Sequence, residues 1–69
     1  MKYYYLITNG EVTEADAYTE YDGIESILVV AESEAQALEL ADQYDRGEIE
    51  CGNYWDTDRQ MAVSCLYDN

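Results

Sequence analysis

The apolar residues near the start of the chain form a short run with the composition of a β-strand. Residues 2–8 (KYYYLIT) are rich in aromatic and β-branched side chains and are followed by Asn9-Gly10. Asn-Gly is the strongest two-residue hairpin signal, because both turn positions need positive φ. The turn therefore predicts that the next residues return along the first strand, with Tyr5 opposite Glu14.

Residues 11–25 (EVTEADAYTEYDGIE) alternate acids with small or aromatic residues, as an edge or half-buried strand does. A second hairpin signal, Asp22-Gly23, connects them to residues 24–31, the most apolar run of the chain. Together the turns predict a meander whose middle strand is the acidic stretch. Its apolar face is expected to hold Tyr4, Leu6, Ala15, Ala17, Leu28 and Val30. Its opposite face is expected to be acidic and to hold Tyr3, Tyr5, Glu14, Asp16, Tyr18, Glu20 and Glu25.

This meander contains one unfavourable pair. It sets Glu20 directly opposite Glu25, and like charges in a cross-strand pair destabilise a sheet. A bulged or irregular course for residues 13–22 therefore stands as the alternative to a regular strand.

A helix is predicted over residues 34–46. Ser33 is a favourable N-cap and Gln36, three residues on, completes a capping-box pattern. Gly47 is suited to the position just past the C-cap. One stripe of the helix is apolar, at the spacing of a core-facing surface. Its members are Ala37, Leu40, Ala41 and Tyr44.

Two further strand-like runs, residues 48–56 and 59–67, predict a final hairpin. The element order is then β-β-β-α-β-β. Strands grouped around one helix favour an α+β fold, with an antiparallel sheet of four to five strands and the helix on one face. A hairpin turn centred on Asp58 would place Cys51 opposite Cys65 in the core. Two buried thiols, a cross-strand disulfide and, least favoured, a metal site are the alternatives for this pair.

The charge of the chain is strongly unbalanced. Sixteen acidic residues and three basic ones give a net charge of −13 over 69 residues. At this length the chain is expected to form a single compact acidic domain that spans residues 1–69. Direct binding to nucleic acid or to an anionic membrane requires clustered Lys and Arg, so both are excluded. With no signal peptide at its start, the chain is expected to be cytoplasmic. Basic protein surfaces are the remaining class of charged macromolecular partner.

Catalysis is not expected. The chain has no His, so no Ser or Cys nucleophile has an imidazole partner. It also contains no phosphate-binding loop and no dinucleotide fingerprint. Neither an EF-hand loop nor a set of soft metal ligands is present, so no metal site and no cofactor is predicted.

Acids interleaved with tyrosines suit a partner surface made of Arg and Lys, through ion pairs and guanidinium stacking. DNA-binding proteins present such surfaces, and fixed carboxylates on a small sheet can imitate the charge of a duplex. We predict Tyr18 and Tyr21 as aromatic anchors for such a partner. The predicted phosphate surrogates are Glu14, Asp16, Glu20, Asp22, Glu25, Glu39 and Asp42.

The chain has 69 residues, opens with MKYYY, contains the strand-to-helix passage ILVVAESEAQALELA and is strongly acidic. In these features the whole chain resembles the small acidic anti-CRISPR proteins of phages and mobile elements, several of which are DNA mimics. Type I anti-CRISPRs, including the type I-C group, are the most similar in these respects. The resemblance implies a stoichiometric inhibitor that occupies the DNA path of a CRISPR surveillance complex, near its PAM-recognising large subunit. We expect the chain to act as a monomer in the host cytoplasm. An inhibitor of a restriction or DNA-repair enzyme and a small structural or assembly protein are the alternatives.

Overall fold

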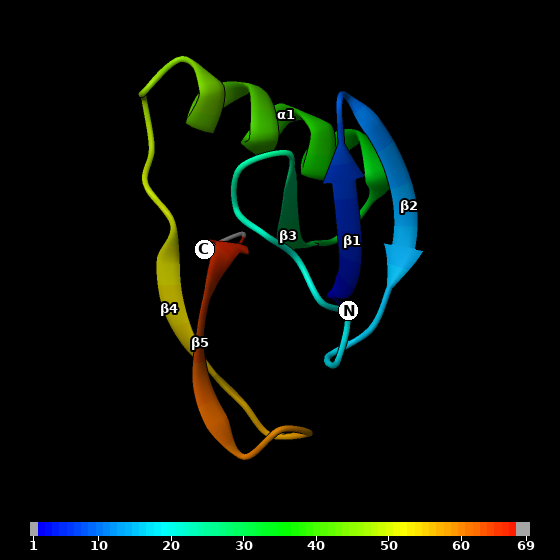
Figure 1. The fold of residues 1–69 in the computed structure, drawn as a ribbon, viewed down its shortest axis with the longest axis vertical. Coiled ribbons are helices and arrows are strands. Elements are labelled where there is room, and N and C mark those ends of the chain that lie inside the picture. Colours follow the sequence, from blue (N-terminus) through cyan, green and yellow to red (C-terminus); the bar gives the residue numbers. More distant parts are fainter. Residues whose placement is uncertain (1, 68–69) are drawn as a thin grey trace.

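The computed structural model describes residues 2–67, except for the side chains at positions 53, 54, 56, 64 and 67. Within residues 2–67, five strands and one helix follow one another in the predicted order, which confirms the α+β class (Figure 1). The elements are β1 (Tyr3–Thr8), β2 (Glu11–Ala15), β3 (Ser26–Ala31), α1 (Glu34–Asp45), β4 (Gly52–Asp56) and β5 (Met61–Tyr67).

The first hairpin has the predicted register, with Tyr5 opposite Glu14, and Asn9 and Gly10 both adopt positive φ. The predicted meander is wrong, however. The strand order is β2-β1-β3-β5-β4, so β3 pairs with β1, and the acidic β2 lies at the edge. Edge positions leave one side of a strand open to water, which suits acidic side chains, whereas the more apolar β1 gains from an interior position between β2 and β3. The pair of Glu20 and Glu25 is thereby avoided.

The sheet is mixed. Strands β3 and β5 run parallel and pair through Val29 with Leu66 and Val30 with residue 67, while every other pair is antiparallel. A parallel connection needs a crossover, and α1 lies within it. Since only the end of β5 joins β3, the rest of the β4–β5 hairpin projects away from the helix (Figure 1).

Both faces of the sheet are covered. The helix packs on the face that carries Tyr5, Ile7, Val29 and Leu66. On the other face, Leu28, Val30 and Cys65 form a second buried cluster, against which Tyr4, Ala15 and Tyr21 pack. The prediction that Tyr3 and Tyr5 belong to an acidic solvent face is therefore wrong for Tyr5, which is buried beneath the helix. Strand β3 is apolar on both faces, so it needs a cover on each side.

The helix has the predicted N-cap. The Ser33 side chain accepts a hydrogen bond from the N–H of Gln36 at 3.2 Å, and the Gln36 side chain accepts one from the N–H of Glu32 at 2.7 Å. Ala37 and Ala41 are buried, with Leu40 and Tyr44 packed at the border of the core, which confirms the apolar stripe.

The C-terminus of the helix closes in a Schellman motif. The N–H of Gly47 donates to the carbonyl of Tyr44 at 3.0 Å, and that of Glu48 donates to the carbonyl of Gln43 at 2.9 Å. Gly47 sits at φ +75°, in the left-handed region that other L-residues adopt at a cost.

We expect Gly47→Ala to lower the free energy of unfolding by about 1 kcal/mol. An added Cβ meets no atom within 4 Å, so the cost comes from the backbone alone. Urea denaturation at neutral pH measures it. Gly47→Asn is the matched control, because Asn tolerates positive φ, and it should cost less than Gly47→Ala. Equal stability of Gly47→Ala and the parent would contradict the assignment.

The final hairpin forms one residue out of the predicted register. Cys65 is opposite Gly52, because the turn spans residues 57–60 with Gln60 at φ +54°. A one-residue shift moves side chains to the other face of a strand. Cys65 is buried as predicted, but Cys51 precedes β4 and is exposed, and both are free thiols. The two cysteines are therefore not a facing core pair.

Candidate binding surface

The acidic stretch leaves the sheet after Ala15 because its own carboxylates form turns. The Asp16 carboxylate accepts hydrogen bonds from the N–H of Tyr18 at 2.8 Å and from the Thr19 hydroxyl at 3.2 Å. The backbone N–H of Asp16 in turn donates to Thr19 Oγ1 at 2.9 Å. Asp side chains compete with ladder hydrogen bonds in this way. The prediction that the acids continue as one extended row is therefore wrong beyond Glu14.

Asp22 organises the return into β3. Its Oδ1 accepts hydrogen bonds from the N–H groups of Ile24, Glu25 and Ser26, each at 2.9 Å. Hydrogen bonds from the backbone, the one from Ser26 first, hold the pKa of Asp22 below its usual range. This carboxylate therefore has a structural task in the fold, although it is exposed to solvent.

We expect Asp22→Asn to destabilise the protein at neutral pH and to make little difference in strong acid. The folded pKa lies below the unfolded value near 3.8, so this carboxylate stabilises the fold above that value. Its contribution is lost as the pH falls through the folded pKa. Urea denaturation of parent and variant between about pH 2 and pH 7 measures the difference. Glu25→Gln removes the same charge from the neighbouring exposed side chain and is the control. A stability gap that stays constant over this range would contradict the role of Asp22.

Tyr18 ties the acidic segment to the β4–β5 turn. Its hydroxyl donates to the carbonyl of Asp58, and the guanidinium carbon of Arg59 lies 5.9 Å from the centre of its ring. Arg59 also donates to the carbonyl of Thr19 at 3.4 Å. Tyr18 is nevertheless 66% exposed, so it remains accessible to a partner. Tyr21 is half-buried against the Leu28 cluster, and burial raises the pKa of its hydroxyl.

All seven predicted phosphate surrogates are exposed, but they lie on several parts of the surface. Glu14 and Asp16 line one cavity, and Glu20 lines another together with Tyr18 and Tyr21. Glu25, beside Asp22, lies near the C-terminal turn of the helix. Glu39 and Asp42 are on the exposed side of α1. The acids therefore lie on several separate parts of the surface and do not form a single stripe.

The basic residues are engaged by the protein itself. Arg46 forms an ion pair with Glu48, and Arg59 contacts Tyr18 and Thr19. Lys2 lines the cavity that also contains Glu14 and Asp16. The chain therefore presents its negative charge with little compensation from its own cations.

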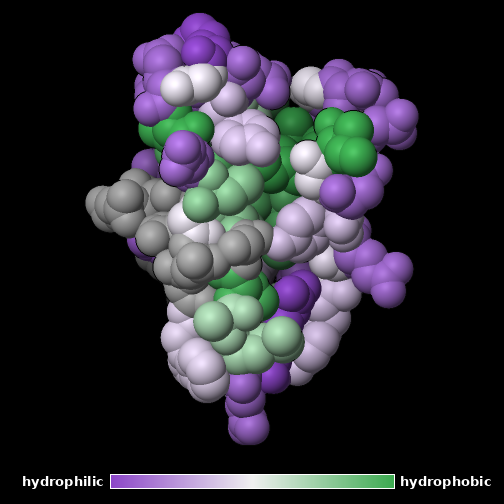
Figure 2. Space-filling model, turned by 60° about the vertical axis from the view of Figure 1, so that its left-hand side comes forward, coloured by the Kyte–Doolittle hydropathy of each residue, from purple (hydrophilic) through white to green (hydrophobic). Residues whose placement is uncertain are grey.

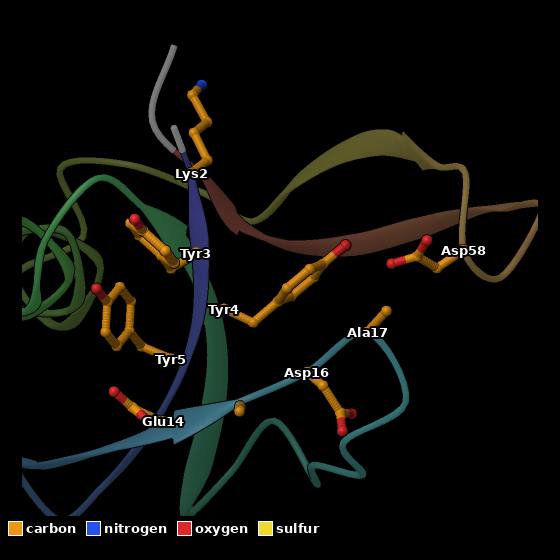
Figure 3. A pocket seen from close by; sticks show the side chains of 9 residues that line it. Lys2, Tyr3, Tyr4, Tyr5, Glu14, Asp16, Ala17 and Asp58 are labelled. Atoms are coloured by element: carbon orange, nitrogen blue, oxygen red, sulfur yellow. The ribbon is translucent and has the colours of Figure 1, made fainter.

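A cavity of about 630 Å³ opens where β1 and β2 separate. The pairing of β1 with β2 ends at Tyr4 and Ala15, and the chain leaves the sheet at Asp16. Figure 3 shows Tyr4 extending across this space with its hydroxyl directed toward Asp58 on the β4–β5 turn. The complete lining is Lys2, Tyr3, Tyr4, Tyr5, Glu14, Ala15, Asp16, Ala17 and Asp58.

On the helix side of this cavity, two tyrosine rings lie beside carboxylates. The Tyr3 and Tyr5 rings contact edge to face, with centroids 6.4 Å apart, and Glu14 lies next to Tyr5 (Figure 3). Burial, then the negative charges of Glu34 and Glu14, raise the pKa of Tyr5. The Tyr5 hydroxyl therefore stays protonated and polar at the rim of the core.

Tyr3, Tyr4 and Asp58 line this cavity although the sequence pattern did not mark them as site residues. The sequence does carry one signal for the tyrosines. Consecutive strand residues point to opposite faces of a sheet, so the run of tyrosines at the start of the chain places aromatic rings on both faces of β1. Asp58 is brought close by the contacts of the β4–β5 turn with the segment after β2, where Tyr18 donates to the carbonyl of Asp58 and Arg59 donates to that of Thr19. In the two strands that flank this turn, Trp55 on β4 and Met61 on β5 are 61% and 51% exposed. Figure 2 shows that apolar residues form a band down one face, bordered by strongly hydrophilic residues.

Within residues 2–67, no helix combines the length and apolar content needed to cross a membrane. The described side chains also include no group of three or more His, Cys, Asp and Glu placed to hold a metal ion. Comparison with protein-family models, curated proteins and solved structures gives no match.

Proposed function

We propose that this protein is a non-enzymatic inhibitor that mimics the charge of DNA and occupies the basic DNA-binding surface of a host defence complex. The observation that carries the proposal is the exposure of all seven predicted surrogates on a molecule of net charge −13. A fold that served stability alone would pair these acids with Lys and Arg, because self-repulsion opposes the compact state.

The charge density is comparable to that of a duplex. The molecule extends 30 Å along its longest axis. DNA carries one charge per about 1.7 Å, so about 18 charges occupy the same length of duplex. The net charge of −13 is of the same order. A basic channel that accepts DNA would therefore attract this protein by the same long-range field.

The distribution of the acids favours an enclosing partner. Glu14, Glu20 and Glu39 lie on different parts of the surface, so a flat basic patch would meet only some of them. A channel or cleft that surrounds DNA would meet several at once. With the resemblance to anti-CRISPR proteins, this makes a CRISPR surveillance complex in the host cytoplasm the proposed target, through its PAM-recognising large subunit. The protein acts on it as a monomer.

A DNA-competition assay tests the proposal. A purified type I surveillance complex is mixed with labelled target DNA and increasing amounts of the protein. We expect stoichiometric loss of DNA binding, with an inhibitor affinity that falls steeply as salt screens the charges. Unchanged DNA binding in the presence of excess inhibitor would overturn the CRISPR target. The same assay on restriction and DNA-repair enzymes then separates the alternative targets, and failure with all of them would refute DNA mimicry.

A further inference from the structure

The cavity between β1, the segment after β2 and the β4–β5 turn has the chemistry of a guanidinium-binding site. We propose that it receives an arginine side chain of the basic partner, with the Tyr4 ring as the stacking surface and the Asp58 carboxylate as the counter-ion. This inference rests on the proposed function, because it names the side chain through which the partner is recognised.

The aromatic wall is fixed in place by the fold. The Tyr4 ring packs against the Leu28, Val30 and Cys65 cluster and remains part-exposed. In Figure 3 it extends into the cavity from β1. A planar guanidinium stacks on such a ring, whereas the compact and strongly hydrated ammonium of lysine gains less. A tyrosine held by its neighbours also loses little conformational entropy on binding.

The charges around the ring favour a cation. Three carboxylates and one ammonium line the cavity, and all four residues are exposed. Asp58 faces Tyr4 across the space, while Glu14 and Asp16 lie along the β2 side (Figure 3). Lys2 lies at the edge opposite Glu14 and Asp16, and its own positive charge opposes the binding of a partner's cation. A volume of about 630 Å³ leaves room for an arginine side chain beside it.

The protein itself already contains one arginine that contacts a tyrosine ring in this way. Arg59 lies over the Tyr18 ring and donates to the carbonyl of Thr19 on the neighbouring segment. That contact combines an aromatic face with a hydrogen-bond acceptor, as the cavity beside Tyr4 does with Asp58. The intramolecular arginine thus provides an independent example of the geometry that a partner arginine would adopt.

The test is an NMR titration of the labelled protein with a capped tetra-arginine peptide and, in parallel, with capped tetra-lysine. At low ionic strength, we expect tetra-arginine to bind about fivefold more tightly. Its amide shift changes should cluster at residues 3–5, 15–17 and 58. Equal affinities, or shift changes spread evenly over the acidic surface, would refute a guanidinium site.

Variants that are expected to change the affinity for tetra-arginine in opposite directions make the test more specific. Asp58→Asn should weaken tetra-arginine binding about threefold, since it removes one exposed ion pair. Lys2→Gln should strengthen it by a similar factor. Tyr4→Leu should abolish the preference for arginine over lysine. Glu39→Gln, far from the cavity, is the control and should weaken both peptides equally. If Tyr4→Leu does not fold, the opposed effects of Asp58→Asn and Lys2→Gln still decide, and their absence would overturn the site.

The outcomes separate this inference from the proposed function. If tetra-arginine binds in the cavity but the protein leaves DNA binding by its targets unchanged, DNA mimicry is wrong and the guanidinium site stands. If DNA competition succeeds but Asp58→Asn and Lys2→Gln leave inhibition and peptide binding unchanged, the site is wrong and mimicry stands.

Discussion

Reversal of four exposed carboxylates is expected to abolish partner binding and to leave the fold intact. Each reversal changes the net charge by two units, so the set brings it from −13 to −5. Repulsion replaces attraction at the interface, and we expect the Kd to rise at least about a hundredfold at moderate salt, since like charges brought together cost several kcal/mol. The substitutions are Glu14→Lys, Glu20→Lys, Glu39→Lys and Asp42→Lys.

Asp16 and Asp22 are left unchanged in this variant for a structural reason. Their carboxylates accept backbone hydrogen bonds in the two turns, so their reversal would confound binding with folding. The isosteric set with Gln and Asn at the same four positions is the control and should bind with intermediate affinity. Circular dichroism checks that both sets fold. Retained affinity of the folded Lys variant, measured by calorimetry, would place the interface elsewhere on the molecule.

Truncation of the most buried leucine is expected to unfold most of the protein. Leu28 is 0% exposed and lies between the sheet and the segment that carries Tyr21. Leu→Ala changes at such sites cost about 2–5 kcal/mol, because they lose contacts and leave a cavity. A domain of this size rarely has more than about 3–5 kcal/mol of stability in total. Leu28→Ala should therefore be largely unfolded at 25 °C, as far-UV circular dichroism and urea titration would show.

The matched control is the same substitution on the surface. Leu38 on α1 is 37% exposed, and we expect Leu38→Ala to change the free energy of unfolding by no more than about 0.5 kcal/mol. A cooperative melt of Leu28→Ala within a few degrees of the parent would mean that the second core cluster contributes little to stability.

Local signals in the sequence specify several features of this fold. Asn9-Gly10 fixes the first hairpin and its register, because both residues adopt positive φ at little cost. Ser33, Gln36 and Gly47 fix the ends of the helix through hydrogen bonds that span a few residues. In each case the decisive interaction lies within one turn or one hairpin of the signal.

The position of each strand in the sheet depends on long-range packing. Asp22-Gly23 has the sequence of a hairpin turn. In the structure, however, the Asp22 carboxylate accepts hydrogen bonds from three backbone N–H groups, and the strand that follows, β3, pairs with β1. The alternation of acids and apolar residues fits an edge strand and a turn segment equally well. The pairing partner of β3 decides between them, and β1 takes that interior place because it is apolar on both faces.

The candidate site divides in the same way. The sequence by itself determined the −13 charge and predicted that the acids are exposed, because both follow from composition. The proposal of a basic partner rests on this charge. Tertiary structure alone decided that the acids lie on several separate parts of the surface, that Asp16 and Asp22 hold turns, and that Asp58 faces Tyr4 across a cavity. The physical reason is distance along the chain. Asp58 and Tyr4 are far apart in the sequence, and they line one cavity because Tyr18 and Thr19, in the segment after β2, hold the β4–β5 turn through hydrogen bonds.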